Sequence, residues 1–507
     1  MKTTPAHHYP GIASAPRFRV TIGVLLSVAL AFSSCTVPVT KQLPMAQVAQ
    51  PAQERILGVT LKDGTEVAFD PAGAILRGDR VEANVKGVPY SVSLADLQRL
   101  WVERREISAV RTLGLVVGVL GGGLLVALAM KQSCPFVYSW DGTHYVFDAE
   151  PYGGAITRGL EKDDFSELSH LREQDGEYRL LLTNEVDETQ HTNLMELWVV
   201  DHAPGSRVVA DQRGGLHAFK QIERPTAARD RYGKDLLPWL ATTDKKIWEP
   251  ESVPGPDGSL RQELQLTFAK PPGATQVNLI ANAATGLWGS YMIKKMTELR
   301  GSEAGKFLAA IDRDPEAVKA VHAWAAREET YVLRIEVKEP TGWEVRGALI
   351  GSGPFLAEDR MIPLDISRVA GPAIELRMRP PVGFWAFNSF GAAYGPDATV
   401  PFATVAMKSA RTTHGEDVLG DLARVDDKYY RMPEMTDRAE VTFLAPPRSS
   451  GMDRTVFLHS RGWYELHLHA DGPPDQETLS MISDQPDGPA QFAVNERVKW
   501  QRTSQSK

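Results

Sequence analysis

Short runs of alternating apolar and polar residues recur from residue 134 onward, separated by turn-forming Gly, Pro, Asn or Asp. Successive side chains of a strand point to opposite faces of a sheet, so this period of two predicts strands with one buried face. The chain is therefore expected to be mainly β, with tandem β-sandwich-like domains. The clearest runs are 178–183, 194–200, 263–268, 276–281, 331–338, 375–379, 439–444 and 454–459.

One stretch within this part of the chain has a helical pattern instead. Phe307, Ile311, Val318 and Trp324 recur at helical spacing, which predicts a helical insertion over 290–327. The expected domains are a β-rich module over 134–275, a jelly-roll-like β-sandwich with the insertion over 276–410, and a C-terminal β-rich segment and tail over 411–507.

Residues 55–108 show a smaller pattern of the same kind. Asp63-Gly64 divides two alternating runs in the way that a hairpin turn does. These residues are expected to form a small β-barrel or roll, although about 50 residues are marginal for burying a core alone. The preceding Pro/Gln-rich stretch, 36–54, has no periodicity and is expected to be a tether.

The first 35 residues have the three parts of a secretory signal. Basic residues precede an apolar run over 20–32, which is too short to span a bilayer comfortably, and Ser33-Ser34-Cys35 follows. This ending resembles the lipobox of bacterial lipoproteins, except that Phe32 stands where that pattern prefers Leu. The resemblance implies that Cys35 carries a lipid anchor in the cell envelope. The alternative is an ordinary cleaved signal, and the sequence does not choose between the inner and the outer membrane.

A second apolar segment lies at 109–131. Its 112–130 stretch carries no charge and is long enough to cross a bilayer, and Gly114, Gly118 and Gly122 recur on one helix face. Such a stripe of small residues allows close helix packing in membranes, so a transmembrane helix and a homo-oligomer are both expected possibilities. The alternative is an apolar segment that does not span the membrane.

Around Cys134 the chain carries a recognisable opening motif. Residues 134–155 read CPFVYSWDGTHYVFDAEPYGGA, and further matching pieces occur at 175–180, 189–190, 199–205, 227–235, 425–428, 455–458 and 462–465. The motif resembles a module of uncharacterised bacterial extracytoplasmic lipoproteins, found beside propeller-type or tetratricopeptide repeats in large surface proteins. The resemblance implies location and fold, and it implies no enzymatic activity. Within the motif, Asp141-Gly142 predicts a tight hairpin turn.

Two groups of residues are candidates for binding. Glu465, His467 and His469 would lie on one face of a strand, where two imidazoles and a carboxylate could hold a metal ion, although a solvent-facing strand shows the same pattern. Aromatic residues near Gly and Pro in the central third could stack on sugar rings, or could pack in the core. The candidates of this second group are Trp288, Trp343 and Trp385.

These observations favour a non-catalytic cell-envelope lipoprotein that binds or scaffolds a partner, either glycan or protein. The net charge of −8 and the lack of a basic stripe argue against nucleic acid as the partner. No cofactor and no catalytic residue is predicted. The alternative is an envelope hydrolase or metal-dependent enzyme with a site assembled from distant loops, which should show a pocket joining perturbed titratable groups.

Overall fold

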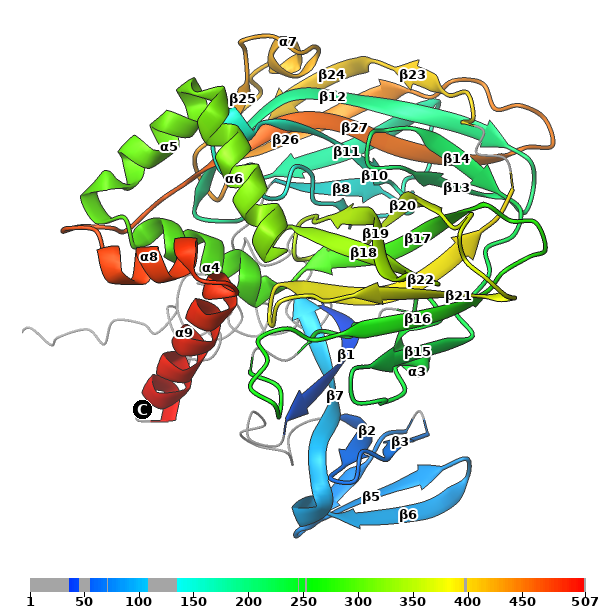
Figure 1. The fold of residues 1–507 in the computed structure, drawn as a ribbon. Helices are drawn as coiled ribbons and strands as arrows, with labels where there is room; N and C mark the ends of the chain where they lie inside the picture. The colour runs from blue at the N-terminus through cyan, green and yellow to red at the C-terminus, as the bar shows by residue number, and fades with distance from the viewer. Residues whose placement is uncertain are drawn as a thin grey trace, which may run out of the picture.

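Figure 1 shows a computed structural model of the chain, which describes residues 36–44, 55–107 and 135–505, apart from 71, 245, 251–252 and 396–398. The predicted signal with Cys35 and the predicted helix with Gly114, Gly118 and Gly122 lie outside the described residues, as does Cys134. Within the described ranges, every helix is too short or too polar to cross a bilayer.

The part of the chain after residue 134 folds mainly as two β-sandwich-like units, one above the other in Figure 1. The upper unit, called here the outer sandwich, packs the sheet β10-β27-β12-β23, with β25 paired to β12, against the sheet β24-β26-β11-β8-β9. Its strands are β8 Phe136–Trp140, β9 Tyr145–Ala149, β10 Lys162–Glu167, β11 Glu177–Thr183, β12 Glu188–His202, β23 Ala403–Val405, β24 Met407–Thr412, β25 Tyr430–Met432, β26 Arg438–Leu444 and β27 Asp453–Leu466. The hairpin of β13 Arg207–Ala210 and β14 Leu216–Phe219 adjoins it.

The turn predicted at Asp141-Gly142 is confirmed. Asp141 accepts a hydrogen bond from the backbone N–H of Thr143 at 2.7 Å, and Gly142 takes the left-handed backbone conformation, with a φ of 99°. The strands that it joins hold aromatic pairs side by side, with Trp140 and Tyr145 ring centroids 5.2 Å apart. Local turn chemistry therefore sets the start of the outer sandwich.

The lower unit in Figure 1, called here the inserted sandwich, lies in the sequence between β14 and β23. The sheet β15-β16-β21-β18-β19 faces the sheet β20-β17-β22, and buried residues of both sheets share one core, including Leu266, Leu376, Leu279 and Phe387. Its strands are β15 Ala227–Asp230, β16 Leu264–Ala269, β17 Gln276–Thr285, β18 Val332–Glu339, β19 Gly342–Ile350, β20 Glu358–Asp365, β21 Ala373–Met378 and β22 Trp385–Ala393.

The predicted domain boundaries at 275 and 410 do not follow these sheets. β27, from the predicted C-terminal segment, pairs along nearly all of β12, from Glu188 opposite Leu466 to His202 opposite Asp453. Likewise β16, from the predicted 134–275 module, pairs with β21 of the predicted 276–410 domain. Alternation predicts which segments are strands, but it does not say which strand pairs with which across some 250 residues of chain.

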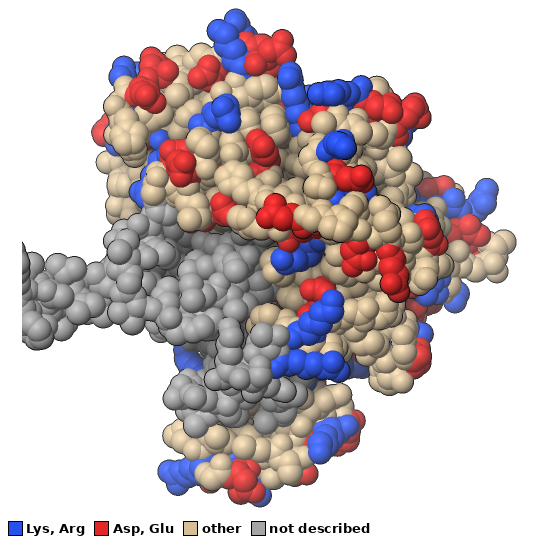
Figure 2. Space-filling view, turned by 90° about the vertical axis from the view of Figure 1, so that its left-hand side faces the viewer, with Lys and Arg blue, Asp and Glu red and all other residues tan. Residues whose placement is uncertain are grey.

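Helices cover one side of the two sandwiches (Figure 1). The predicted insertion is helical, with α4 Leu287–Glu298, α5 Ala304–Arg313 and α6 Pro315–Glu328. In the predicted C-terminal region, 411–507, strands are followed by a tail of two helices, α8 Gln476–Asp484 and α9 Gly488–Gln505. Asp475 caps α8 by accepting a hydrogen bond from the N–H of Thr478, and Phe492 of α9 is buried against the inserted sandwich. Figure 2 shows Lys and Arg intermixed with Asp and Glu on the face seen from this side.

The small N-terminal unit is β-rich, as predicted. It consists of the sheets β1-β7-β2-β3 and β4-β5-β6 around a core that includes Val59, Val81 and Leu100. Its strands are β1 Thr36–Pro44, β2 Ile56–Leu61, β3 Glu66–Ala68, β4 Ile75–Arg77, β5 Arg80–Val85, β6 Val88–Ser93 and β7 Leu97–Ile107. The first part of the predicted tether, 36–44, is therefore a strand, because it pairs with β7.

The N-terminal unit contacts the inserted sandwich through an aromatic joint. Trp101 of β7 meets Trp239 edge to face, with centroids 5.0 Å apart, and Trp239 lies on the short helix α3 Leu237–Leu240. Lys234 pairs with Glu66 at 2.6 Å beside it. This joint supplies burial that the small unit lacks by itself.

Candidate functional site

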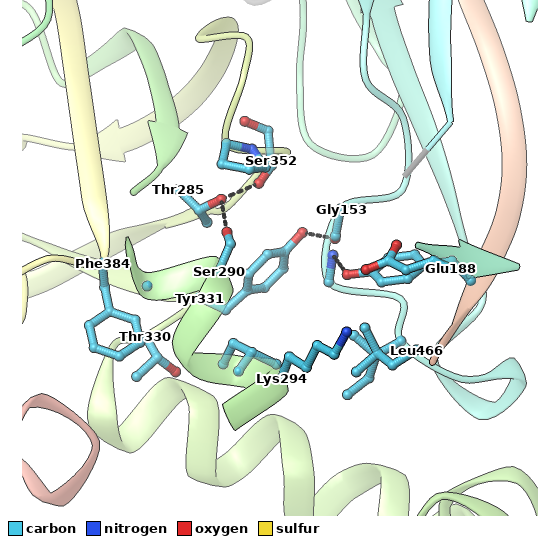
Figure 3. A pocket seen from close by; sticks show the side chains of 16 residues that line it. Gly153, Glu188, Thr285, Ser290, Lys294, Thr330, Tyr331, Ser352, Phe384 and Leu466 are labelled. Carbon is cyan, nitrogen blue, oxygen red and sulfur yellow. Dashed lines mark hydrogen bonds between the residues drawn. The ribbon is translucent and has the colours of Figure 1, made fainter. Parts of the chain in front are cut away.

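A small cavity lies where the outer and the inserted sandwich meet (Figure 3), with a volume of about 40 Å³. The outer sandwich contributes the loop after β9, the start of β12 and the end of β27 to its lining. The inserted sandwich contributes α4, the residues before β18 and the loop after β19. Of the lining residues, Gly154 is the exposed one, so it marks a side where the cavity meets solvent.

The Gly153-Gly154 loop of the opening motif fits here because it has no side chains. A Cβ atom at Gly153 would lie 2.7 Å from the backbone nitrogen of Gly353, and one at Gly154 would lie 2.8 Å from the ring of Tyr331. Gly154 also has a φ of +84°, which L residues with side chains rarely adopt. The glycines therefore allow the loops of the two sandwiches to approach each other.

Hydrogen bonds join the two sandwiches around this loop. The Tyr331 hydroxyl donates to the carbonyl of Gly153, as the dashed line in Figure 3 shows, and Lys162 donates to the same hydroxyl at 2.7 Å. The N–H of Gly154 donates to the Tyr464 hydroxyl at 3.3 Å. The walls of the cavity are thus held by bonds on both sides of the junction.

Glu188, the first residue of β12, is a buried carboxyl group at this cavity. Its side chain is fully buried, and burial raises its pKa to about 8. One carboxyl oxygen accepts a hydrogen bond from Gln190 at 3.4 Å, while the other, Oε1, has no partner. Glu188 is therefore mostly protonated at neutral pH and can donate a hydrogen bond.

Lys294 of α4, a largely buried residue, brings an amine to the same cavity. The residue is 6% exposed, and it forms neither a hydrogen bond nor an ion pair with any residue that the structure describes. Figure 3 shows its amine directed across the cavity to the side where Glu188 and Leu466 lie. Thr330 lines the cavity too, and its buried Oγ1 has no partner.

A second group of charges at the junction is held together by ion pairs. Arg360 of β20 donates to Asp164 at 2.9 Å and to Glu358 at 2.7 Å, and both carboxylates are buried while Arg360 is mostly so. Burial raises the pKa of Glu358 to about 6, with Arg360 acting against that rise. This triad joins the sandwiches as an internal ionic contact, although the Oε1 atom of Glu358 has no hydrogen-bond partner. Lys294 differs from Arg360 in that no described carboxylate forms an ion pair with it.

The predicted metal ligands do not come together. The strand β27 ends at Leu466, and His467 is hydrogen-bonded on both ring nitrogens, to Asp187 at 2.8 Å and to Thr189 at 2.9 Å. His469 and Glu465 lie at the exposed surface. Across the described ranges, no three His, Cys, Asp or Glu side chains are arranged to hold a metal ion.

The predicted stacking residues are not free platforms for a sugar. Trp288 and Trp385 are buried in the core of the inserted sandwich, with their indole N–H groups bonded to the carbonyls of Ala493 and Glu329. Trp343, on β19, is half-buried, and both Lys338 and Arg377 lie over its ring, at 4.8 and 4.5 Å from the centroid. The core-packing alternative holds for the first two residues.

Sequence reasoning did not single out Glu188, Lys294 or Thr330. Several strands separate Glu188 from Lys294 in the sequence, and the helices α5 and α6 separate Lys294 from Thr330. Their common cavity exists only because α4 packs beside β12 and β27. One signal was available in the sequence, since Lys294 stands between Met292 and Met296, which are buried. A charged residue inside an apolar run is often a functional one when it is buried.

When the chain is compared with models of known protein families and with curated proteins, it matches none of them.

Proposed function

We propose that the protein is a non-catalytic lipoprotein of the cell envelope that binds a polypeptide partner through the cavity between its two sandwiches. The signal-like N-terminus and its lipobox-like ending at Cys35 support the envelope location. The observation that carries the binding role is Lys294, a 6% exposed residue that lines the cavity and forms no hydrogen bond or ion pair with any described residue. A charged side chain that is largely removed from water without a hydrogen-bonding partner is destabilising, and a group supplied by a ligand reduces that cost.

The environments of the three predicted stacking tryptophans favour a polypeptide over a glycan as the partner. Two of the predicted stacking residues, Trp288 and Trp385, are consumed by core packing, and cations lie over the third, Trp343. The cavity, at about 40 Å³, takes a small chemical group rather than a sugar ring. A chain end or a side chain of a polypeptide can present such a group.

The proposal is tested by photo-crosslinking in the envelope of cells that produce the full chain. A photo-reactive residue replaces Pro354, which lines the cavity and is half-buried, and the control position is Val345, which is exposed on β19 away from the cavity. A discrete adduct is expected from position 354, none is expected from 345, and Lys294→Met should abolish the first.

Two results would overturn the proposal. If no adduct forms at position 354, the cavity is not the binding site. The same conclusion follows if the adduct persists in the Lys294→Met protein. An adduct that resists protease but is removed by glycan-degrading enzymes would show that the partner is a glycan instead.

One observation favours an enzyme as a second candidate. Glu188, with its pKa raised to about 8, is a carboxylic acid that could act as a general acid near neutral pH. This candidate predicts that the wild type releases a cleaved partner, while Glu188→Gln accumulates an intact one. The binding proposal predicts an intact, crosslinked partner in both proteins.

A further inference from the structure

Unsatisfied polar groups gather at the cavity between the sandwiches. Lys294 has no hydrogen-bond or ion-pair partner among the described residues, and the Oε1 atom of Glu188 and the Oγ1 atom of Thr330 have no partner either. All three residues are buried and line the same cavity. Nine in ten or more buried polar groups in proteins do have a partner, so such a cluster points to a ligand or to water.

The size of the cavity limits what can occupy it. A water molecule needs at least about 10–15 Å³ of such space, so a volume of about 40 Å³ holds about three waters or one group of similar size. A carboxylate group has three heavy atoms and fits this space. The apolar lining residues Ile156, Ile293 and Leu466 can accommodate the aliphatic carbon that carries such a group.

The charges that line the cavity favour an anion. Lys294 is its basic lining residue, and Glu188 is its acidic one. Because burial raises the pKa of Glu188 to about 8, the neutral acid predominates at pH 7 and the lining is net positive. A protonated carboxyl group and an ammonium group are both hydrogen-bond donors, which is what the two oxygens of a carboxylate require.

We propose that the cavity binds a carboxylate group, one oxygen of which is held by the ammonium of Lys294 and the other by the carboxyl group of Glu188. This inference rests on the proposed function and specifies the group that the partner presents. It assigns the ammonium group of Lys294 and the protonated carboxyl group of Glu188, both hydrogen-bond donors, a common ligand. Since a polypeptide carries a carboxylate at its C-terminus and on Asp and Glu side chains, the partner has suitable groups.

The test uses acetate as the probe and the full chain in detergent. Thermal unfolding is followed at pH 6.5 with increasing sodium acetate, against acetamide, which has the same shape without the charge, and against sodium chloride at equal ionic strength. A ligand that binds the folded state raises the unfolding midpoint in proportion to its occupancy. Acetate is expected to raise the midpoint more than acetamide and chloride do.

Variants assign the effect to the cavity. Lys294→Met removes the charge at nearly constant side-chain length and should weaken the apparent affinity for acetate by about tenfold or more. Lys295→Met is the matched control, because Lys295 is the next residue on α4 but pairs with Glu298 at 2.7 Å outside the cavity lining. An equal response in Lys294→Met and wild type, or equal stabilisation by acetamide or chloride, would overturn the inference.

The pH dependence is a second readout. The charged groups that act on Glu188 are Lys294 from α4, Asp187 from the residue before β12, and Glu150 from the loop after β9. As the pH rises through about 8, Glu188 ionises and repels the ligand, so the affinity of the wild type for acetate should fall about tenfold per pH unit above this point. Glu188→Gln keeps a donor and should show no such fall, and an equal fall in both proteins would contradict the role of Glu188.

The failure of this inference differs from the failure of the proposed function. If acetate does not bind but the adduct from position 354 still depends on Lys294, the partner presents a group other than a carboxylate, and the carboxylate inference is overturned alone. If the adduct is absent as well, the cavity is not a binding site and both are overturned.

Discussion

Replacing Glu188 with Gln is expected to make the protein more stable at neutral and alkaline pH. Burial raises the pKa of this carboxyl group from an ordinary value of 4.5 to about 8. Between these two pH values the folded state therefore holds a proton that the unfolded state has released. The free energy of unfolding therefore falls as the pH rises from 4.5 to 8. Gln has no proton to lose, so the variant does not share this fall.

The magnitude follows from the size of the pKa shift. One pKa unit corresponds to about 1.4 kcal/mol, so a rise from 4.5 to about 8 amounts to roughly 5 kcal/mol above pH 8 and to roughly 3 kcal/mol at pH 7. Below pH 4.5 both states hold the proton, and the contribution vanishes. Wild type and Glu188→Gln should thus have similar stabilities at pH 4 and diverge steadily above it.

The assay is urea unfolding followed by tryptophan fluorescence at intervals from pH 4 to 9. The difference between wild type and Glu188→Gln isolates the titration of Glu188, since all other groups are shared. Glu465→Gln is the matched control, because the Glu465 side chain is 57% exposed. The reasoning is refuted if the unfolding free energies of wild type and Glu188→Gln run parallel across this pH range.

Other substitutions test the joints of the fold. Gly154→Ala should lower the free energy of unfolding by about 1–3 kcal/mol, because Gly154 has a φ of +84° and a Cβ atom there would collide with the Tyr331 ring. Gly205→Ala, at a φ of +76° with open space around it, measures the cost of the backbone conformation alone. Equal losses of stability in the two variants would contradict the contribution of the collision with Tyr331. Arg360→Met should cost about 3–5 kcal/mol in urea unfolding, since it leaves Asp164 and Glu358 buried without their cation; a neutral effect would show that the triad is not needed at the junction. Trp101→Ala should destabilise the N-terminal unit by about 3–5 kcal/mol and expose it to protease before the sandwiches, and unchanged digestion would argue against the joint with Trp239.

Local features of the fold could be predicted from the sequence because local chemistry sets them. The turn at Asp141-Gly142 needs a residue that tolerates positive φ, and the alternating run at 178–183 matches β11. The helical spacing of Phe307 and Ile311 likewise matches α5. In each case the signal and the structure lie within a few residues of each other.

Long-range pairing and the cavity could not be predicted in this way. β12 and β27 belong to one sheet although they are some 250 residues apart, and no local pattern encodes that neighbour. Glu188, Lys294 and Thr330 look like ordinary strand, helix and loop residues until the two sandwiches meet. Trp385 begins β22, where all nine residues are buried, so its neighbouring Gly and Pro residues suggested a loop that the fold does not expose.

The central claim is that Lys294 makes the cavity between the sandwiches a binding site for a partner. The most direct measurement is the yield of the photo-adduct from position 354 in wild type, Lys294→Met and Lys295→Met chains at equal expression. A strong adduct in the wild type and in Lys295→Met, with none in Lys294→Met, is the predicted result. The same yield in all three chains would contradict the claim.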